Sequence, residues 1–213
     1  MKVTIMYDNT VFQSGLSADW GFSALVETSR QRILFDTGGK GSILLSNMKK
    51  LGIDLQSIHD VFISHAHFDH TGGLSAFLNE NPEVTVWVPP SFKRVPQARK
   101  LVTVKTPLML HEGIYSTGEL EGIEQSLCVQ TLKGVVIIAG CSHPDLRHII
   151  DASAKYGRVY GIIGGLHGNK PDALEGLQLI CATHCTQHKA EIRSRFPESF
   201  IDGGAGRVLE IDE

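Results

Sequence analysis

The sequence predicts a layered α/β fold, an αββα four-layer sandwich in which two sheets pack face to face and helices cover their outer sides. Three observations support this prediction: strand patterns alternate with helical patterns, glycine accounts for 22 of the 213 residues, and no low-complexity stretch interrupts the chain. Alternating strands and helices are typical of layered domains, and frequent glycines indicate tight turns between short elements. Periodicity alone also fits another layered α/β fold.

The first half of the chain begins with a meander of strands. Three short strands, in which β-branched or aromatic residues recur between turn residues, are expected at 3–7, 23–28 and 32–35. Residues 42–51 carry apolar side chains at helical spacing and stop before Gly52, as a helix with a glycine cap does. Residues 60–64 have the pattern of a buried strand, and residues 71–78 that of a short helix.

The second half repeats this alternation. Strands are expected at 84–88, 101–104, 125–130, 135–139, 159–163 and 178–182. Two further short strands are expected near the carboxyl end. Helices are expected at 144–156, with Pro144 in the first turn, and at 186–196. Residues 172–177 have short helical potential.

Length and composition narrow the class of protein. A chain of 213 residues, 42% of them hydrophobic, is long enough for a substantial core, so we expect one domain spanning residues 1–213. The net charge of -3 argues against a nucleic-acid-binding surface. We expect a cytoplasmic protein, because the sequence shows neither a signal peptide nor the roughly 20 apolar residues of a membrane helix. The four cysteines are too unevenly spaced for a disulfide framework, which favours reduced thiols.

Four side chains of metal-binding types fall within six residues. His65, His67, Asp69 and His70 directly follow the expected strand at 60–64. Burying such groups is costly unless they are paired or bound to metal, so packing explains the cluster poorly. Side chains two residues apart in extended chain point the same way, so His65 and His67 can face one ion. Asp69 and His70, around the next turn, can face a second. The sequence therefore predicts a metal site here.

Two further histidines follow buried strands. His143 comes after the strand at 135–139, and His184 comes after the strand at 178–182. Three strand ends that each carry a histidine form a convergence that core packing does not require. We therefore expect both residues to be metal ligands, with helix-capping or turn roles as the alternative.

The segment His65-x-His67-x-Asp69-His70 after a buried strand resembles the signature of the metallo-β-lactamase superfamily. Leu34-Phe35-Asp36-Thr37-Gly38 resembles the first motif of that superfamily, in which the aspartate orients a ligand or neighbouring backbone. The alternative for Asp36 is that it opens a Thr-Gly-Gly turn. The resemblance implies an αββα sandwich with metal ions at one edge between the sheets.

Four other short motifs narrow the resemblance to the branch that includes archaeal dihydropterin synthase-like proteins, usually labelled metal-dependent hydrolases. These motifs are Glu-Gln-Ser-Leu at 124–127, Gly-Cys-Ser-His at 140–143, Gly-Gly-Leu-His at 164–167 and Thr-His-Cys-Thr at 183–186. The similarity spans nearly the whole chain. Gln187 and Gly168 depart from this branch, and the segment 168–178 is short, so the substrate stays open.

The resemblance implies two divalent metal ions, with zinc favoured and iron or manganese as alternatives. In the simplest arrangement one ion binds His65, His67 and His143, and the other binds Asp69, His70 and His184. Many relatives instead place a histidine upstream of a bridging aspartate. Residues 140–143 occupy the place of that aspartate, so Cys141 or His167 is also a candidate ligand or close neighbour.

The expected chemistry is hydrolysis of a small-molecule ester, phosphoester or related substrate, because paired ions activate water and neutralise developing negative charge. Asp69 is the catalytic candidate, since it can hold an ion and accept a proton. An anionic substrate would find cationic partners in Lys93, Arg94 or Lys170. The alternatives are a pterin-diphosphate transferase, which the resemblance implies, and a non-catalytic metal- or ligand-binding sensor. We expect no nucleic-acid or membrane partner.

Overall fold

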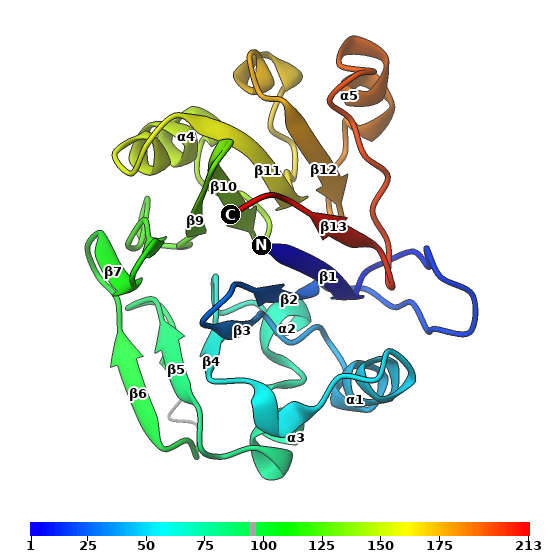
Figure 1. Cartoon of the computed structure of the whole chain (residues 1–213), viewed down its shortest axis with the longest axis vertical. Coiled ribbons are helices and arrows are strands. Elements are labelled where there is room, and N and C mark those ends of the chain that lie inside the picture. The colour runs from blue at the N-terminus through cyan, green and yellow to red at the C-terminus, as the bar shows by residue number, and fades with distance from the viewer. Residues whose placement is uncertain (94–96) are drawn as a thin grey trace.

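The computed structural model describes residues 1–93 and 97–213, and two sheets dominate this part of the chain (Figure 1). The first sheet has the strand order β13-β1-β2-β3-β4-β5-β6. Its strands are β1 Lys2–Tyr7, β2 Ser23–Glu27, β3 Arg32–Phe35, β4 Asp60–Phe62, β5 Thr85–Val88, β6 Lys100–Thr103 and β13 Val208–Glu210. β13, β1, β2 and β3 pair antiparallel, whereas β3, β4, β5 and β6 pair parallel.

The second sheet has the order β12-β11-β10-β9-β8-β7. Its strands are β7 Leu108–His111, β8 Ile114–Ser116, β9 Leu127–Thr131, β10 Gly134–Ala139, β11 Val159–Gly165 and β12 Leu179–Thr183. β10, β11 and β12 pair parallel, and the remaining pairs are antiparallel. Each sheet therefore has a parallel part, whose strands all end at one edge.

Helices cover the outer face of each sheet, as Figure 1 shows with α1 and α3 on one side and α4 and α5 on the other. The helices are α1 Gly41–Lys50, α2 Phe68–Thr71, α3 Leu74–Glu80, α4 Leu146–Ala154 and α5 Lys189–Arg195, with 3₁₀ turns at Leu55–Ser57 and Pro171–Leu174. Among these helices, none combines the length and the apolar composition needed to cross a bilayer.

Alternation along the strands produces three apolar layers. Ile33 and Phe35 of β3 point between the sheets, where they join Phe62 of β4 and Ile138 of β10. Leu34, between them in sequence, points to the opposite face and packs with α1 and α3. A third cluster joins the second sheet to α4 and α5. Because successive strand side chains face opposite ways, one strand serves two layers, and the predicted αββα arrangement follows.

Several element boundaries differ from the sequence-based expectations. The helix expected at 71–78 is two pieces, α2 and α3, and α4 begins at Leu146 after the Asp145 cap rather than at Pro144. Asp145 accepts a hydrogen bond from the Arg147 backbone, which places the cap one residue beyond the proline. Strands β7 and β8 were not expected, and of the two expected final strands only β13 forms in the described part of the chain.

Candidate metal centre

The end of β4 delivers the first group of candidate ligands. His65 is buried, His67 is exposed and precedes α2, and Asp69 and His70 lie within α2. The following glycines let this turn approach the loop after β3. A Cβ atom at Gly72 would lie 2.2 Å from the carbonyl oxygen of Gly39, closer than such atoms approach in proteins. The Thr-Gly-Gly sequence after His70 therefore allows the close backbone contact that fixes the turn.

The loops after β10 and β12 bring the remaining groups to the same edge. Among the described residues, five non-glycine residues have positive φ, and four of them lie just after β3, β10, β11 and β12: Asp36 at 51°, Ser142 at 56°, His167 at 45° and His184 at 46°. Non-glycine residues adopt this backbone region rarely and at a cost. Strained backbone is thus concentrated where the candidate ligands converge.

The first cluster consists of three imidazoles. Donor atoms of His65, His67 and His143 lie within 4.8 Å of one another. Nε2 of His143 is 3.1 Å from Nδ1 of His67, and the His65 ring centroid is 4.6 Å from that of His67. His143 is half-buried, so this cluster opens toward solvent on the side of His67 and His143.

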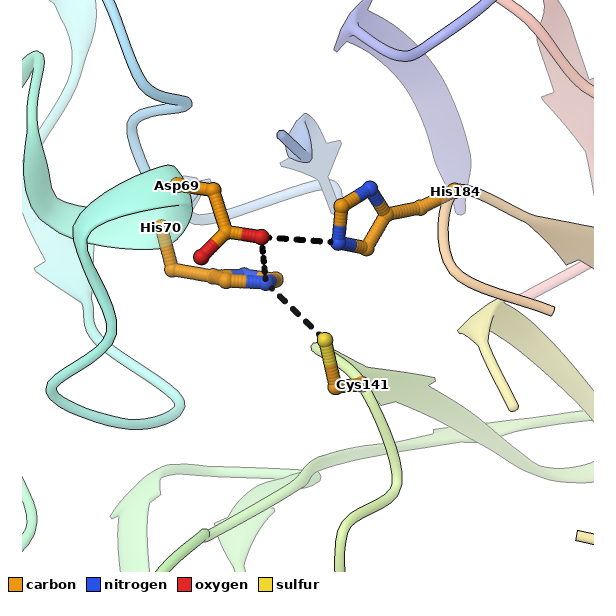
Figure 2. Close-up of side chains that lie close together, drawn as sticks. All are labelled: Asp69, His70, Cys141 and His184. Atoms are coloured by element: carbon orange, nitrogen blue, oxygen red, sulfur yellow. Dashed lines mark hydrogen bonds and ion pairs between the residues drawn. The ribbon is translucent and has the colours of Figure 1, made fainter. Parts of the chain in front are cut away.

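The second cluster lies deeper and adds a thiol. Figure 2 shows the side chains of Asp69, His70, Cys141 and His184 pointing toward one another, and their donor atoms also lie within 4.8 Å of one another. Oδ2 of Asp69 is 3.2 Å from Nε2 of His184 and 3.6 Å from Nε2 of His70. The His65 and His70 ring centroids are 4.2 Å apart, so the two clusters are adjacent.

Asp36 orients one imidazole of each cluster. Its Oδ2 atom is 2.7 Å from Nδ1 of His70 and accepts a 2.7 Å hydrogen bond from the Ser64 hydroxyl. Because that hydroxyl donates to Asp36, its oxygen accepts from Nδ1 of His65, 2.9 Å away. Both imidazoles therefore carry their proton on Nδ1 and turn the Nε2 lone pair inward. Carboxylate partners of this kind hold metal-binding histidines in place.

Asn9 orients the imidazole of His184 in the second cluster. Nδ1 of His184 is 3.0 Å from Oδ1 of Asn9, and the amide of Asn9 donates to the carbonyl oxygen of His184. Oδ1 of Asn9 also accepts from the backbone of Gly21, which fixes the orientation of the amide. Nε2 of His184 consequently faces the second cluster without its proton.

Glu124 holds the loop that carries Cys141 and His143. Its side chain is buried; Oε1 accepts hydrogen bonds from the backbone N–H groups of Gly140, Cys141 and Ser142, and Oε2 accepts one from His143. Four bonds to one carboxylate satisfy a loop that would otherwise bury unpaired donors.

Two imidazole nitrogens of the site are buried and have no hydrogen-bond partner among the described residues. They are Nε2 of His65 and Nε2 of His184. Nε2 of His184 lies near the Asp69 carboxylate but without hydrogen-bond geometry. Native proteins rarely leave buried polar atoms unpaired, and a lone pair that faces a cluster of donors is satisfied by a cation. The residues present therefore fit metal ions.

The titration behaviour of the site suits metal binding. Burial, reinforced by neighbouring imidazoles, lowers the pKa of His65 far below its usual value and lowers that of His143 to about 4. Burial also lowers the pKa of His184. Burial alone would raise the pKa of Asp69, but the imidazoles of His184 and His70 lower it. At neutral pH these groups have the protonation states that bind cations.

His70 differs from the other imidazoles. Burial opposes its protonation, yet the adjacent Asp36 carboxylate raises the pKa of His70 above the usual value. Hydrogen bonding to the charged form and an opposite charge nearby both favour protonation. In the metal-free protein a proton on His70 therefore competes with a cation.

The structure leaves other predicted residues outside the clusters. His167 lies beside His143, with ring centroids 5.0 Å apart, but belongs to no group of converging donors among the described residues. Lys93 donates to the carbonyl oxygen of Pro90, Lys170 is exposed, and Arg94 lies outside the described residues.

Sequence reasoning missed three residues that position the ligands. Asn9 lies two residues after the end of the first strand, much as the candidate ligands lie after other strands. Ser64 directly precedes His65. Glu124 begins the Glu-Gln-Ser-Leu motif, to which sequence reasoning gave no role. Position at a strand end was the available signal for Asn9; nothing local indicated that Glu124 would reach a loop beginning 16 residues later.

Comparisons with known proteins agree with this architecture. The family model of the metallo-β-lactamase superfamily matches residues 21–107. The chain is 29% identical over 280 residues to 7,8-dihydropterin-6-methyl-4-(β-D-ribofuranosyl)-aminobenzene-5'-phosphate synthase of Methanocaldococcus jannaschii, with 98% of this chain and 95% of the relative covered. Because that alignment is longer than this chain, the relative has segments with no counterpart here.

Solved structures extend the similarity to the whole chain. The crystal structure of Tm1679, a metal-dependent hydrolase of the β-lactamase superfamily, has a TM-score of 0.81 and 26% identity, with all of both chains covered. The metallo-β-lactamase fold protein YhfI from Bacillus subtilis, at 14% identity, has a TM-score of 0.73 over 98% of this chain and 99% of its own, and shows the fold alone. Residues 21–107 therefore match the family model of the metallo-β-lactamase superfamily, and the chain as a whole has the metallo-β-lactamase fold.

Proposed function

We propose that this protein is a metal-dependent hydrolase that binds two divalent ions, preferably zinc, and acts on a small ester, phosphoester or related substrate. His65, His67 and His143 would hold one ion, and Asp69, His70 and His184 the other. The observation that carries the proposal is the pair of adjacent donor clusters with buried, unpartnered Nε2 atoms. The superfamily domain supports it.

The side chains of the clusters have distinct tasks in this proposal. When bound, paired divalent cations supply Lewis acidity that activates water and neutralises charge on an attacked carbonyl or phosphoryl group. Asp69, ionised and half-buried, lies beside the Nε2 atoms of His184 and His70 and accepts a proton from the attacking water. The exposed His67 and half-buried His143 mark the side from which substrate reaches the centre.

Elemental analysis tests the metal centre. We expect protein purified without added metal to carry close to two divalent ions per chain, and a His65→Ala/His67→Ala variant to lose at least one of them because it removes two of the three ligands of the first ion. A His59→Ala/His188→Ala variant, which changes two histidines outside the clusters, serves as the matched control and should keep its metal. Equal metal content in all three proteins would overturn the proposal.

Turnover tests the reaction. Hydrolysis of a panel of carboxylic esters, phosphoesters and lactones should stop when the ions are chelated and return when zinc is added back. Tight binding of a panel member without turnover of any would favour a sensor instead.

A transferase is the second candidate, because the 29% identical relative is a synthase and the similarity covers nearly the whole chain. Two exposed aromatic side chains beside the centre also fit a planar substrate such as a pterin. Trp20 is 59% exposed and its ring centroid lies 5.1 Å from that of His184, while Phe68 is 63% exposed and directly precedes Asp69. Flat heteroaromatic rings stack on such side chains.

The two reactions give different products from one substrate. A pterin diphosphate offered with an aromatic acceptor yields diphosphate and a carbon-carbon coupled product in the transferase, whereas the hydrolase yields the pterin alcohol by water addition. Mass spectrometry with ¹⁸O-labelled water separates them, since only hydrolysis incorporates the label.

A further inference from the structure

The thiol of Cys141 lies inside the second cluster, not merely beside it. The side chain is buried, and its Sγ atom is 3.1 Å from Nε2 of His70 (Figure 2). Ligands at the usual zinc bond lengths in a tetrahedral site are separated by about 3.3–3.6 Å. The distances of 3.1, 3.2 and 3.6 Å between neighbouring donor atoms of this cluster are close to that spacing.

The donors are turned toward a common point by contacts on their far sides. Asp36 holds Nδ1 of His70, and Asn9 holds Nδ1 of His184, so both Nε2 atoms face inward. The backbone N–H of Cys141 donates to Glu124, which fixes where the thiol projects. Nε2 of His184 is buried and forms no hydrogen bond with any described residue. This unpartnered atom is the independent sign of a cation at the centre of the cluster.

We propose that Cys141 is a thiolate ligand of the second metal ion, which is then bound by Asp69, His70, Cys141 and His184. The proposal rests on the metal centre of the proposed function and adds a ligand type to it. A carboxylate and a thiolate together neutralise one divalent cation, whereas the first cluster supplies only neutral imidazoles. Thiolate ligands select borderline-soft ions such as zinc, while manganese and magnesium prefer oxygen. The second position is therefore the zinc-selective one.

Cobalt(II) substitution tests the ligand directly, because a thiolate bound to cobalt(II) gives an intense near-ultraviolet charge-transfer band. We expect this band in the cobalt-loaded protein and its loss in Cys141→Ser. Cys185→Ser is the matched control: its Sγ atom lies 3.7 Å from the carbonyl oxygen of Cys141, outside the converging donors, and the band should persist. A band that survives in Cys141→Ser, or is absent from the wild type with two cobalt ions bound, overturns the proposal.

Failure of the proposed function gives a different result. A wild-type protein that takes up no cobalt contradicts the metal centre itself, whereas two ions without the band contradict only the thiolate. X-ray absorption of the zinc-loaded wild type needs no variant. A zinc–sulfur shell at about 2.3 Å is expected, and a shell of nitrogen and oxygen alone overturns the proposal.

Metal selectivity provides a second readout. Cys141→Asp keeps a negative ligand but replaces sulfur with oxygen, so the ratio of zinc to manganese affinity at the second site should fall by roughly tenfold or more. Competition with a chromophoric chelator measures both affinities. An unchanged ratio would mean that the thiol donates a hydrogen bond to His70 and binds no ion.

Discussion

At the scale of single residues, one carboxylate connects the two clusters. Asp36 accepts from His70 directly and from His65 through the Ser64 hydroxyl, and its own backbone is held at a φ of 51°. A single side chain thus sets the tautomers of one imidazole in each cluster. Because a histidine binds metal only through an unprotonated nitrogen, the tautomer decides whether the site exists.

Asp36→Asn tests this connection. The amide keeps the volume of the carboxylate but places an N–H₂ group against at least one of its present donors, which favours the wrong tautomer of His70. We expect the affinity for zinc to fall about 10- to 100-fold, measured by chelator competition. Asp60→Asn is the matched control, because Asp60 is also buried and bonded to a histidine, His111, but lies at the opposite end of β4. Equal losses in both variants would contradict a specific role.

The sequence indicated which candidate residues converge better than it indicated the contacts that hold them. The spacing of His65, His67, Asp69 and His70 was sufficient to indicate metal binding, because so many desolvated polar groups have no structural purpose in six residues. His143 and His184 were found through their position after strands. Cys141 stayed ambiguous in the sequence, since a buried thiol is common in cores and no local pattern indicates that its sulfur lies 3.1 Å from His70.

At the scale of elements, the site depends on a loop clamped by a distant loop. Glu124, between β8 and β9, accepts four backbone hydrogen bonds from residues 140–143 after β10. Burial raises the pKa of Glu124, and the backbone donors oppose that rise. The loop that carries His143 thus has its conformation set from outside the loop.

Glu124→Gln tests the clamp. The amide oxygen can keep the three bonds to Gly140, Cys141 and Ser142, but its nitrogen then faces the N–H group of His143. We expect the free energy of unfolding to fall by about 1–3 kcal/mol and zinc binding to weaken, because a buried donor is left unpaired. Urea unfolding and metal titration measure the two effects. Glu83→Gln, at an exposed position, should change neither; a loss of similar size there would contradict the clamp.

Element types were more predictable than element ends. The apolar signal of β1, β3, β10 and β12 is strong because nearly all of their residues are buried, which means that both faces of each strand are covered. β7 was not expected because Leu108 and Met109 are exposed and its pattern is weak. The break between α2 and α3 depends on Gly72 and Gly73 packing against the loop after β3, a tertiary contact that no local pattern records.

At the scale of the whole molecule, the buried imidazoles link stability to pH. The pKa values of His65, His143 and His184 are lowered in the folded protein, whereas that of His70 is raised. Below about pH 6.5 the unfolded chain binds protons at the first three residues that the folded chain does not. Their contribution to stability is therefore lost as pH falls, whereas the contribution of His70 is lost as pH rises through its raised pKa.

We accordingly expect metal-free protein to become less stable as pH falls from 6.5 to 5, since three groups act in this range while the contribution of His70 no longer changes below the unfolded pKa of about 6.5. Urea unfolding at stepped pH measures the slope. His65→Gln should flatten it by up to about 1.4 kcal/mol per pH unit, the effect of one proton. A Gln substitution at the exposed His59 leaves the slope unchanged. Stability that rises on acidification, or a slope unaffected by the His65 change, would contradict this linkage.

The division of the candidate ligands between the sheets has a consequence for the order in which the proposed metal centre would form. The turn after β4 belongs to one sheet, the loops after β10 and β12 belong to the other, and His70 and Cys141 are 71 positions apart. Neither cluster is complete until both halves of the sandwich have docked. With the proposed metal centre, ion capture would consequently be a late event in refolding, and the recovery of tight metal binding would report the moment at which the two halves meet.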